Sequence, residues 1–288
     1  MRPARAVGVL GVGPIDPQTP VVHADDLGFS RGDGCFEATR VVTSPDGEHR
    51  IDHLDEHFDR FDSSCAGLDL PPVDRPAWRE LIGQLLAGWS EPGEAMLRLL
   101  LSRGREWELD AGVTGVATLV PTSPETLRQR HEGVQAITLR RGFSVDAFHD
   151  AHWLLGGVKT LSYAVNMAGL REARRRGAQD VLFVDGAGRL LEAPTATVAW
   201  LAGDVLTTVA VDGTGILHSI TQRALFAAAE LAGYRTGYAT GTVADLLASD
   251  GAWLLSSGRG VAQLLTLDSQ PVPSQPGRTA ELSKLAGF

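Results

Sequence analysis

Cysteine is nearly absent from this sequence, and long apolar runs are missing. Its 288 residues include two cysteines, Cys35 and Cys65, too few for a disulfide framework and typical of a cytoplasmic protein. No stretch approaches the roughly 18–20 apolar residues of a membrane span, and the run 6–10 is too short for a signal peptide. The net charge of −9 argues against nucleic acid or an anionic membrane as a partner. We therefore expect a cytoplasmic globular protein.

Lysine is also scarce. Of the 26 basic residues, 24 are arginine and two are lysine, Lys159 and Lys284. Arginine cannot replace lysine where an amine must lose its proton and attack a carbonyl. Lys284 lies four residues from the C-terminus, and we expect it to be solvated. Lys159 follows Gly156-Gly157-Val158, and apolar neighbours would lower its pKa by desolvation. It is a candidate nucleophilic amine, with an ordinary surface lysine as the alternative.

The order of the predicted elements indicates two domains. We expect an N-terminal α/β domain over residues 1–121, a linker over 122–133 and a C-terminal α/β domain over 134–288. Apolar periodicity predicts helices over 54–68, 75–89, 163–176 and 221–232. Apolar runs predict strands over 5–12, 36–43, 95–102, 113–120, 134–139, 179–185, 190–201, 205–209 and 253–257. This mixture predicts an α/β or α+β fold.

The segment 213–221 brings glycine, serine and threonine to the start of a predicted helix. Free backbone N–H groups and the helix dipole favour a phosphate at such a position. The alternative is that Ser219 or Thr221 only caps the helix. The segment is not a P-loop, because no Gly-Lys-Ser/Thr follows it.

Three other residue types are candidates for chemistry. Glu192 interrupts an apolar run, where its carboxylate either faces water or holds a charged partner such as a protonated ring nitrogen. His53 and His57 have the spacing of a helical metal pair, but Leu54 stands where a zinc protease needs glutamate. No third ligand is evident, so we expect no metal. Cys35 has no evident base, and we expect a small core residue.

A desolvated lysine, a phosphate-binding helix start and a carboxylate are the parts of a pyridoxal-phosphate site. With them the sequence resembles the fold-type IV pyridoxal-phosphate enzymes, or class IV aminotransferases, over about residues 25–267. The motifs that carry the resemblance follow the family's order: Arg31-Gly32-Asp33-Gly34-Cys35-Phe36-Glu37, His57-Phe58-Asp59-Arg60, Lys159, Leu191-Glu192-Ala193, Gly215-Ile216-Leu217-His218-Ser219-Ile220-Thr221 and Ser256-Ser257. Each motif is weak alone, and the ordered set is specific.

The resemblance implies a two-domain fold like that of D-amino-acid aminotransferase, with pyridoxal 5′-phosphate at the domain interface. It implies a homodimer whose partner helps to close the site around a small-molecule substrate. It also implies that Lys159 is the Schiff-base residue and proton shuttle, and that Glu192 pairs with the pyridine nitrogen. The phosphate would be bound by the guanidinium of Arg60, the backbone amides of Ile220 and Thr221, and the hydroxyls of Thr221 and Ser257.

Two stretches depart from the family's usual pattern. Thr195-Ala196-Thr197 stands where many members have Ser-Asn, and Ser219-Ile220-Thr221-Gln222 stands where Gly-Ile-Thr-Arg is usual. Hydroxyl groups remain at both places, so cofactor binding is still expected. The departures concern the fine tuning of the ring's electronics.

Two further motifs are similar to those of 4-amino-4-deoxychorismate lyase: the stretch 32–41, and the strand 99–104 that ends in Ser102-Arg103-Gly104. Branched-chain aminotransferases usually have Gly-Gly-Asn-Tyr after the lysine, where this chain has residues 160–163 as Thr-Leu-Ser-Tyr. The resemblance therefore favours the lyase, which forms p-aminobenzoate and pyruvate in folate biosynthesis. Arg103 is the candidate for a substrate carboxylate.

Other functions remain open from the sequence. The main alternative is a class IV aminotransferase that acts on branched-chain L-amino acids or D-amino acids with a 2-keto acid acceptor. A non-catalytic phosphate- or vitamin-binding protein would give Lys159 and Glu192 no task. A cofactor-free Schiff-base aldolase would use Lys159 but leave the segment 215–221 idle.

Overall fold

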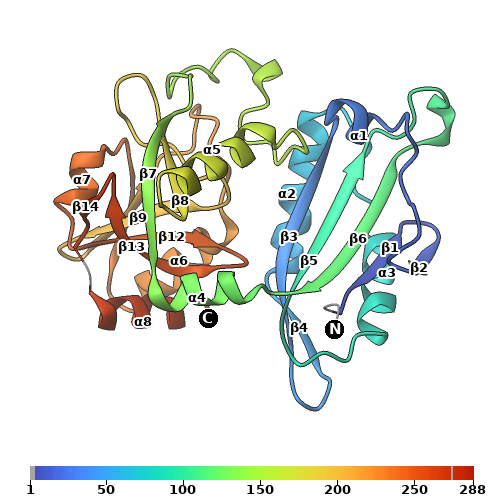
Figure 1. Ribbon diagram of the computed structural model, residues 1–288, viewed down its shortest axis with the longest axis horizontal. Coiled ribbons are helices and arrows are strands. Elements are labelled where there is room, and N and C mark those ends of the chain that lie inside the picture. Colours follow the sequence, from blue (N-terminus) through green and yellow to red (C-terminus); the bar gives the residue numbers. More distant parts are fainter. Residues whose placement is uncertain (1–3, 274) are drawn as a thin grey trace. The chain divides into compact units, whose positions relative to one another are not determined.

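The computed structural model describes residues 4–273 and 275–288, in two compact units of mixed helices and sheets (Figure 1). Unit 1 is Met1–Ser123 with Val158–Tyr163, and unit 2 is Pro124–Gly157 with Ala164–Phe288. The linker expected over 122–133 contains helix α4 (Pro124–Glu132), which packs on a strand of unit 2. Lys159, expected in the C-terminal domain, belongs to unit 1, because its segment pairs with a strand there.

Unit 1 is a six-stranded antiparallel sheet in the order β2-β1-β6-β5-β3-β4. Helix α2 packs on β3, and α3 packs on β1, β2 and β6 (Figure 1). The elements are β1 (Ala6–Val9), β2 (Gly13–Ile15), α1 (Leu27–Arg31), β3 (Gly34–Thr43), β4 (His49–Ile51), α2 (Leu54–Gly67), α3 (Arg75–Ala87), β5 (Gly93–Ser102), η1 (Leu109–Ala111) and β6 (Thr114–Pro121).

The two periodicities of the sequence build the core of unit 1. Strand β5 alternates, so that Leu97 and Leu99 are buried while Arg98 between them is exposed. On α2 the expected helical face is buried and includes Phe58 and Cys65. Cys65 lies 3.6 Å, Sγ to Sγ, from Cys35 on β3, and both are free thiols in the core.

Unit 2 is built on a mixed sheet in the order β11-β10-β9-β12-β13-β7-β8, with β14 paired to β13. Helix α6 packs on β11 and β12, α4 and α8 pack on β13, and α5 packs on β7 and β8. The elements that follow α4 are β7 (Val134–Arg140), η2 (His152–Leu154), α5 (Ala164–Arg175), β8 (Asp180–Val184), β9 (Thr197–Ala202), β10 (Val205–Val209), α6 (Ile220–Leu231), β11 (Arg235–Ala239), α7 (Val243–Leu247), β12 (Gly251–Ser256), β13 (Gly260–Leu267), β14 (Gln270–Pro271) and α8 (Pro276–Leu285).

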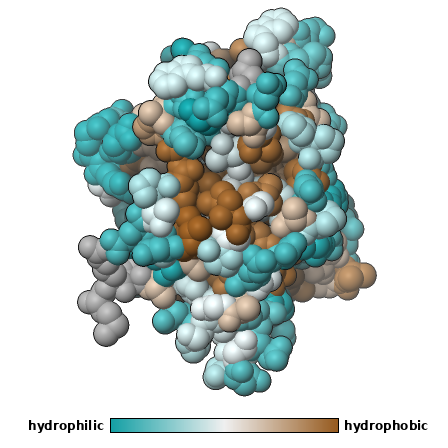
Figure 2. All heavy atoms as spheres, turned by 90° about the vertical axis from the view of Figure 1, so that its right-hand side faces the viewer, coloured by the Kyte–Doolittle hydropathy of each residue, from teal (hydrophilic) through white to brown (hydrophobic). Residues whose placement is uncertain are grey.

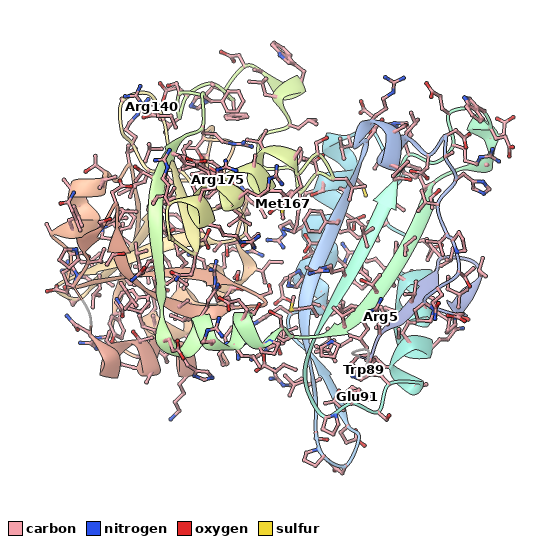
Figure 3. The ribbon with its side chains drawn as sticks, in the orientation of Figure 1. Arg5, Trp89, Glu91, Arg140, Met167 and Arg175 are labelled. Carbon is pink, nitrogen blue, oxygen red and sulfur yellow. The ribbon has the colours of Figure 1, made fainter. Side chains whose placement is uncertain are left out.

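Strands β8, β9 and β12 in the sheet of unit 2 are buried on both faces. All five residues of β8 are buried, as are the first five of β12. This burial explains the continuous apolar runs in the sequence. The charged residues of α5 lie on its outer side: Arg175 (Figure 3) is exposed, and its Nε donates to Glu172 at 2.8 Å. Within the described ranges, every helix falls short of the length and apolar character needed to cross a membrane.

The strand expected over 190–201 is shorter in the structure, where β9 begins at Thr197. Residues 190–196 contain a turn, in which the N–H of Ala193 donates to the carbonyl of Ala196 at 2.9 Å. Pro194 lies inside this turn and has no N–H for a strand ladder. The turn places Glu192 just before it, on an extended segment opposite Phe183.

Candidate active site

Lys159 is held in unit 1 by its backbone on both sides. The N–H of Phe36 on β3 donates to the carbonyl of Lys159 at 2.9 Å, and the N–H of Leu161 donates to the carbonyl of Gly34 at 2.8 Å. The N–H of Lys159 donates to Oγ of Ser64 on α2 at 3.1 Å. Its Nζ lies 4.4 Å from the centroid of the Phe36 ring. This partly buried amine is therefore attached to a rigid strand edge.

Arg60 lies on the same helix and binds the carboxylate of Glu37 on β3. The Nε and NH2 groups of Arg60 donate to Oε1 and Oε2 of Glu37, both at 2.7 Å. Nδ1 of His57 donates to Oε2 of Glu37, also at 2.7 Å. All three residues are mostly buried, and Glu37 is 1% exposed. Arg60 is thus oriented by a buried carboxylate, a contact that no sequence pattern indicated.

The charge states of this cluster follow from its burial and its partners. Burial alone would raise the pKa of Glu37. The hydrogen bonds and charges of Arg60 and His57 outweigh this effect and lower the pKa to about 2. Burial lowers the pKa of His57, against the opposing effect of Glu37. At neutral pH Glu37 is therefore a carboxylate and His57 a neutral imidazole that donates through Nδ1.

The two histidines that have the spacing of a metal pair bind different carboxylates. His57 binds Glu37, whereas His53 precedes α2 in a left-handed conformation and lies 3.5 Å from a carboxylate oxygen of Glu56. In the described part of the chain, no three His, Cys, Asp or Glu side chains are grouped so that they could hold a metal ion.

Arg103 is held by an ion pair and by backbone carbonyls of unit 1. Its Nε donates to Asp33 at 2.7 Å, and its NH1 and NH2 donate to the carbonyls of Asp69 and Leu68. These contacts tie the end of β5 to the turn after α2. A substrate carboxylate would compete with Asp33, and the role of Arg103 in substrate binding stays a prediction.

In unit 2, Glu192 is linked to the loop before α6. Its Oε2 accepts the N–H of Leu217 at 3.3 Å. Ser219 is the N-cap of α6 and accepts the N–H of Gln222 at 3.2 Å, so the capping alternative is correct for Ser219. The amides of Ile220 and Thr221 belong to the first helical turn, where backbone N–H groups have no partner within the helix.

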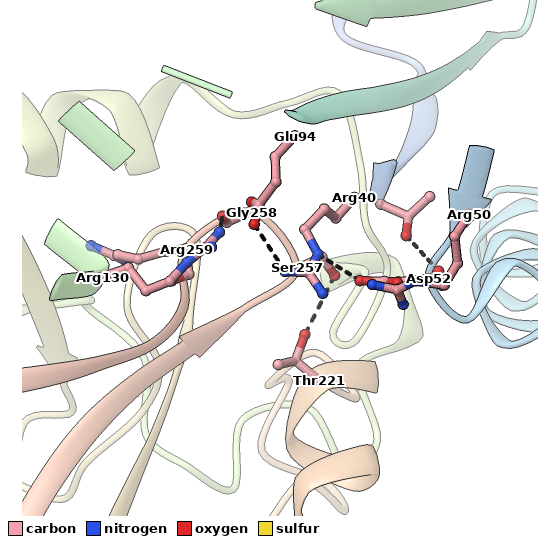
Figure 4. Close-up of polar contacts among 10 residues, drawn as sticks. Arg40, Arg50, Asp52, Glu94, Arg130, Thr221, Ser257, Gly258 and Arg259 are labelled. Atoms are coloured by element: carbon pink, nitrogen blue, oxygen red, sulfur yellow. Dashed lines mark hydrogen bonds and ion pairs between the residues drawn. The ribbon is translucent and has the colours of Figure 1, made fainter. Parts of the chain in front are cut away.

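The hydroxyl groups expected around a phosphate also lie at this helix start. Oγ1 of Thr221 is 3.4 Å from Oγ of Ser257, which follows β12 (Figure 4). Together with the helix dipole, these hydroxyls and the first-turn amides form a donor set suited to a phosphate. Unit 2 therefore combines a carboxylate with a helix end whose donors are suited to an anion.

Two aromatic rings support the loop 213–219, and no sequence pattern indicated this contact. Gly213 and Gly215 have φ of +70° and +72°, a region that favours glycine. A Cβ on Gly213 would lie 2.4 Å from the ring of His149, and one on Gly215 would lie 2.5 Å from the ring of Phe148. The path of this loop therefore requires glycine at both positions.

Replacing Gly215 with alanine should destabilise the protein by about 1–3 kcal/mol, because the new methyl group meets Phe148 and the backbone is strained. Urea denaturation measures the loss. Gly186→Ala is the control, since a methyl group at Gly186 would have no other atom within 4 Å and the backbone there has no positive φ. Equal stability of the two variants would contradict this account.

Comparison with known proteins adds to this geometry. Residues 34–266 match the family described as amino-transferase class IV. The chain is 40% identical, over 91% of both chains, to a protein of Mycobacterium tuberculosis named bifunctional aminodeoxychorismate lyase / D-amino acid transaminase. A solved structure of a hypothetical aminotransferase from M. tuberculosis, in its PLP-bound form, has a TM-score of 0.90 and 38% identity and covers 98% of each chain.

A second solved structure supports the same assignment. A fold IV transaminase from Curtobacterium pusillum has a TM-score of 0.90 and 35% identity, and the match covers 99% of this chain and 100% of that one. The family and fold expected from the ordered motifs are confirmed. The chain belongs to the class IV aminotransferases.

Proposed function

We propose that the chain is a lyase that converts 4-amino-4-deoxychorismate into p-aminobenzoate and pyruvate. As a member of the class IV aminotransferases, it is a pyridoxal-phosphate-dependent enzyme. The observation that carries the lyase proposal is the 40% identity, over 91% of both chains, with a relative whose name includes this activity. The lyase-like strand ending in Ser102-Arg103-Gly104 supports it. We further propose that the enzyme acts in the cytoplasm and supplies folate biosynthesis.

The side chains present fit the groups of pyridoxal phosphate. Unit 1 supplies the amine of Lys159 and the guanidinium of Arg60, which suits a phosphate. Unit 2 supplies the carboxylate of Glu192 for a protonated ring nitrogen, and the start of α6 with Thr221 and Ser257 for the phosphate. When bound, the cofactor supplies an electron sink for the charge left by proton removal.

In the proposed reaction, Lys159 removes the proton from the ring carbon that bears the amine. Glu192 would favour this step, because its carboxylate would stabilise positive charge on the pyridine nitrogen of a bound cofactor. The bond between the ring and the enolpyruvyl oxygen then breaks. The ring becomes aromatic, and the released enolate takes up on its terminal carbon a proton equivalent to the one that Lys159 removed, which gives pyruvate. By binding the phosphate, Arg60 would hold the cofactor so that the reacting carbon keeps a fixed position relative to Lys159 of the same unit.

The test supplies the cofactor-loaded enzyme with aminodeoxychorismate and no keto acid. We expect p-aminobenzoate and pyruvate to form at equal rates. Absence of both products, with the cofactor bound, would reject the lyase proposal. Failure to bind pyridoxal phosphate at all would instead favour the cofactor-free aldolase.

A second candidate activity is transamination of D-amino acids, because the same relative is also named a D-amino acid transaminase. A D-alanine aminotransferase of Bacillus licheniformis is 26% identical over 88% of this chain. The two activities share the first proton transfer. The lyase then breaks the bond to the enolpyruvyl oxygen, whereas a transaminase protonates a different carbon and needs a keto acid as its second substrate. Incubation with 2-oxoglutarate and either D-alanine or L-leucine tests for transamination and for the hand of the donor. Pyruvate from D-alanine, with no product from L-leucine, supports the D-transaminase, and product from L-leucine supports a branched-chain enzyme.

Replacing Glu192 with glutamine should lower kcat by about 10–100-fold in either reaction, because a neutral amide stabilises positive charge on the ring nitrogen less well. Steady-state kinetics measure the effect, with Glu192→Asp as the variant that keeps the charge. If glutamine retained full kcat, the proposed task of Glu192 would be wrong.

We also propose that the protein is a homodimer, supported by an uncovered apolar face on the sheet of unit 1. Val7, Met96, Leu100, Val116 and Val120 are partly exposed and lie opposite the face that packs on α2 and α3. Figure 2 shows hydrophobic side chains gathered in the middle of the surface on the side of β1 and β6. A second copy would bury this face. Light scattering should give twice the chain mass, and Leu100→Glu should reduce the mass to that of one chain.

A further inference from the structure

The carboxylate of Glu37 is surrounded by donors that leave it one orientation. Oε1 accepts Nε of Arg60, and Oε2 accepts NH2 of Arg60 and Nδ1 of His57, each at 2.7 Å. Oε2 also lies 3.3 Å from the N–H of Ala38. A two-point contact with a carboxylate fixes both the plane and the direction of a guanidinium. The edge of Arg60 formed by Nε and NH2 faces Glu37, so the edge that carries NH1 is turned away from it.

The same two elements hold Arg60 and Lys159. His57, Arg60 and Ser64 follow one another on one face of α2, at intervals of three and four residues. Ser64 accepts the backbone N–H of Lys159, and Phe36, the neighbour of Glu37 on β3, donates to the carbonyl of Lys159. The β3–α2 pair therefore sets the position of the guanidinium relative to the backbone of the amine-bearing residue.

Stability alone is a weak reason for this cluster. A buried ion pair is often no more stabilising than apolar residues of similar volume, because both charges must be removed from water. Unit 1 already has a continuous apolar core, with Phe58 and Phe61 on the same helix. A cluster that costs desolvation and fixes a guanidinium fits a role in orientation.

We propose that Glu37, assisted by His57, is a positioning residue that orients Arg60 toward the cofactor's phosphate. This inference rests on the proposed contact between Arg60 and the phosphate. Glu37 does not touch the cofactor or the substrate in this role. Its carboxylate fixes one edge of the guanidinium, and the group is thereby held for the anion before the cofactor arrives.

The test compares two ligands that differ only in the phosphate: pyridoxal phosphate and pyridoxal. Each is titrated into the full-length apoenzyme and its Kd is measured by fluorescence. Glu37→Asp keeps the charge but withdraws the carboxylate by one methylene, and His57→Leu removes the second donor. Asp62→Asn is the matched control, because Asp62 lies on α2 and binds Arg75 at 3.0 Å in the same kind of ion pair.

We expect Glu37→Asp to raise the Kd of pyridoxal phosphate by roughly 10–100-fold and to leave that of pyridoxal within about twofold. His57→Leu should act in the same direction with a smaller effect, and Asp62→Asn should change neither Kd. Thermal unfolding of each apoenzyme separates loss of stability from loss of affinity. A lower Tm with an unchanged ratio of the two Kd values would overturn the positioning role.

Arg60→Lys separates this inference from the proposed function. If Arg60→Lys lowers the preference for the phosphorylated ligand and Glu37→Asp does not, only the positioning role fails. If Arg60→Lys itself leaves the preference unchanged, the contact between Arg60 and the phosphate is wrong, and the inference fails with it. Equal weakening of both ligands by Glu37→Asp would also reject it.

Discussion

Turnover should fall by at least about 10³-fold when Lys159 is replaced by alanine, because the chain then lacks the amine that moves the reacting proton. The neighbouring backbone contacts, from Phe36 to the carbonyl of residue 159 and from residue 159 to Ser64, do not depend on the side chain. The fold and the phosphate-binding groups should therefore remain. We expect pyridoxal phosphate to bind still, with product formation at the detection limit in both the lyase and the transaminase assay.

The chain provides its own control for this experiment. Lys284 is the other lysine, and it lies exposed in α8. Lys284→Ala should keep full activity. After borohydride reduction of the loaded enzyme, mass spectrometry should find the cofactor on the peptide that contains Lys159 and not on that of Lys284. Full activity of Lys159→Ala, or a cofactor attached to Lys284, would refute the assignment.

The second large effect is expected on stability. Glu37→Gln should lower the free energy of unfolding by about 3–5 kcal/mol at pH 7, because it removes one partner of a buried ion pair and takes this carboxylate away from the charge of Arg60. The donor of His57 then faces an amide in place of a carboxylate. Urea denaturation of the apoenzyme measures the loss, and Asp62→Asn, which breaks a more exposed pair on the same helix, should cost less. If both variants lost the same free energy of unfolding, the burial of Glu37 would not account for the larger loss expected in Glu37→Gln.

The same variant should change how stability depends on pH. The pKa of Glu37 falls from its ordinary 4.5 to about 2 on folding, so the unfolded chain binds this proton first on acidification. The stabilisation by Glu37 is therefore complete above pH 4.5 and is lost as the pH falls toward about 2. His57, whose pKa is lowered from 6.5, likewise loses its contribution as the pH falls below that value. Between pH 4.5 and about 3, the free energy of unfolding should fall less in Glu37→Gln than in the parent protein. If the free energy of unfolding fell in parallel with pH in both proteins, Glu37 would not titrate in this way.

The sequence alone determined the parts of the protein that depend on neighbours in the chain. The apolar faces of α2 and α3 and the alternation of β5 were predictable because side-chain period decides which face is buried. Ser219 was a candidate cap from residue type and position, and it caps α6. Lys159 could be selected as the candidate nucleophilic amine because the sequence contains one other lysine. The ordered motifs identified the family.

The sequence did not predict helix α4, because its residues show no apolar periodicity. Its residues are mostly polar, so the segment was expected to be a linker. In the folded unit, Arg130 on α4 is buried and donates to the carbonyls of Gly258 and Arg259, at 2.9 and 3.0 Å (Figure 4). These acceptors lie about 130 positions further along the chain. A helix that packs through such contacts has no local apolar stripe for a sequence pattern to reveal.

The buried charges were likewise decided by the tertiary structure. The sequence shows Glu37 in the apolar strand 34–43, and it shows Arg60 three residues after His57. It does not show that these side chains pair. Glu37 meets Arg60 only because α2 packs on β3, and Arg103 meets Asp33 only because β5 pairs with that strand. Ion pairs depend on distances of a few ångströms between groups far apart in sequence. Residue types and spacing therefore identified the chemistry, and the packing of strand and helix decided which charges are joined.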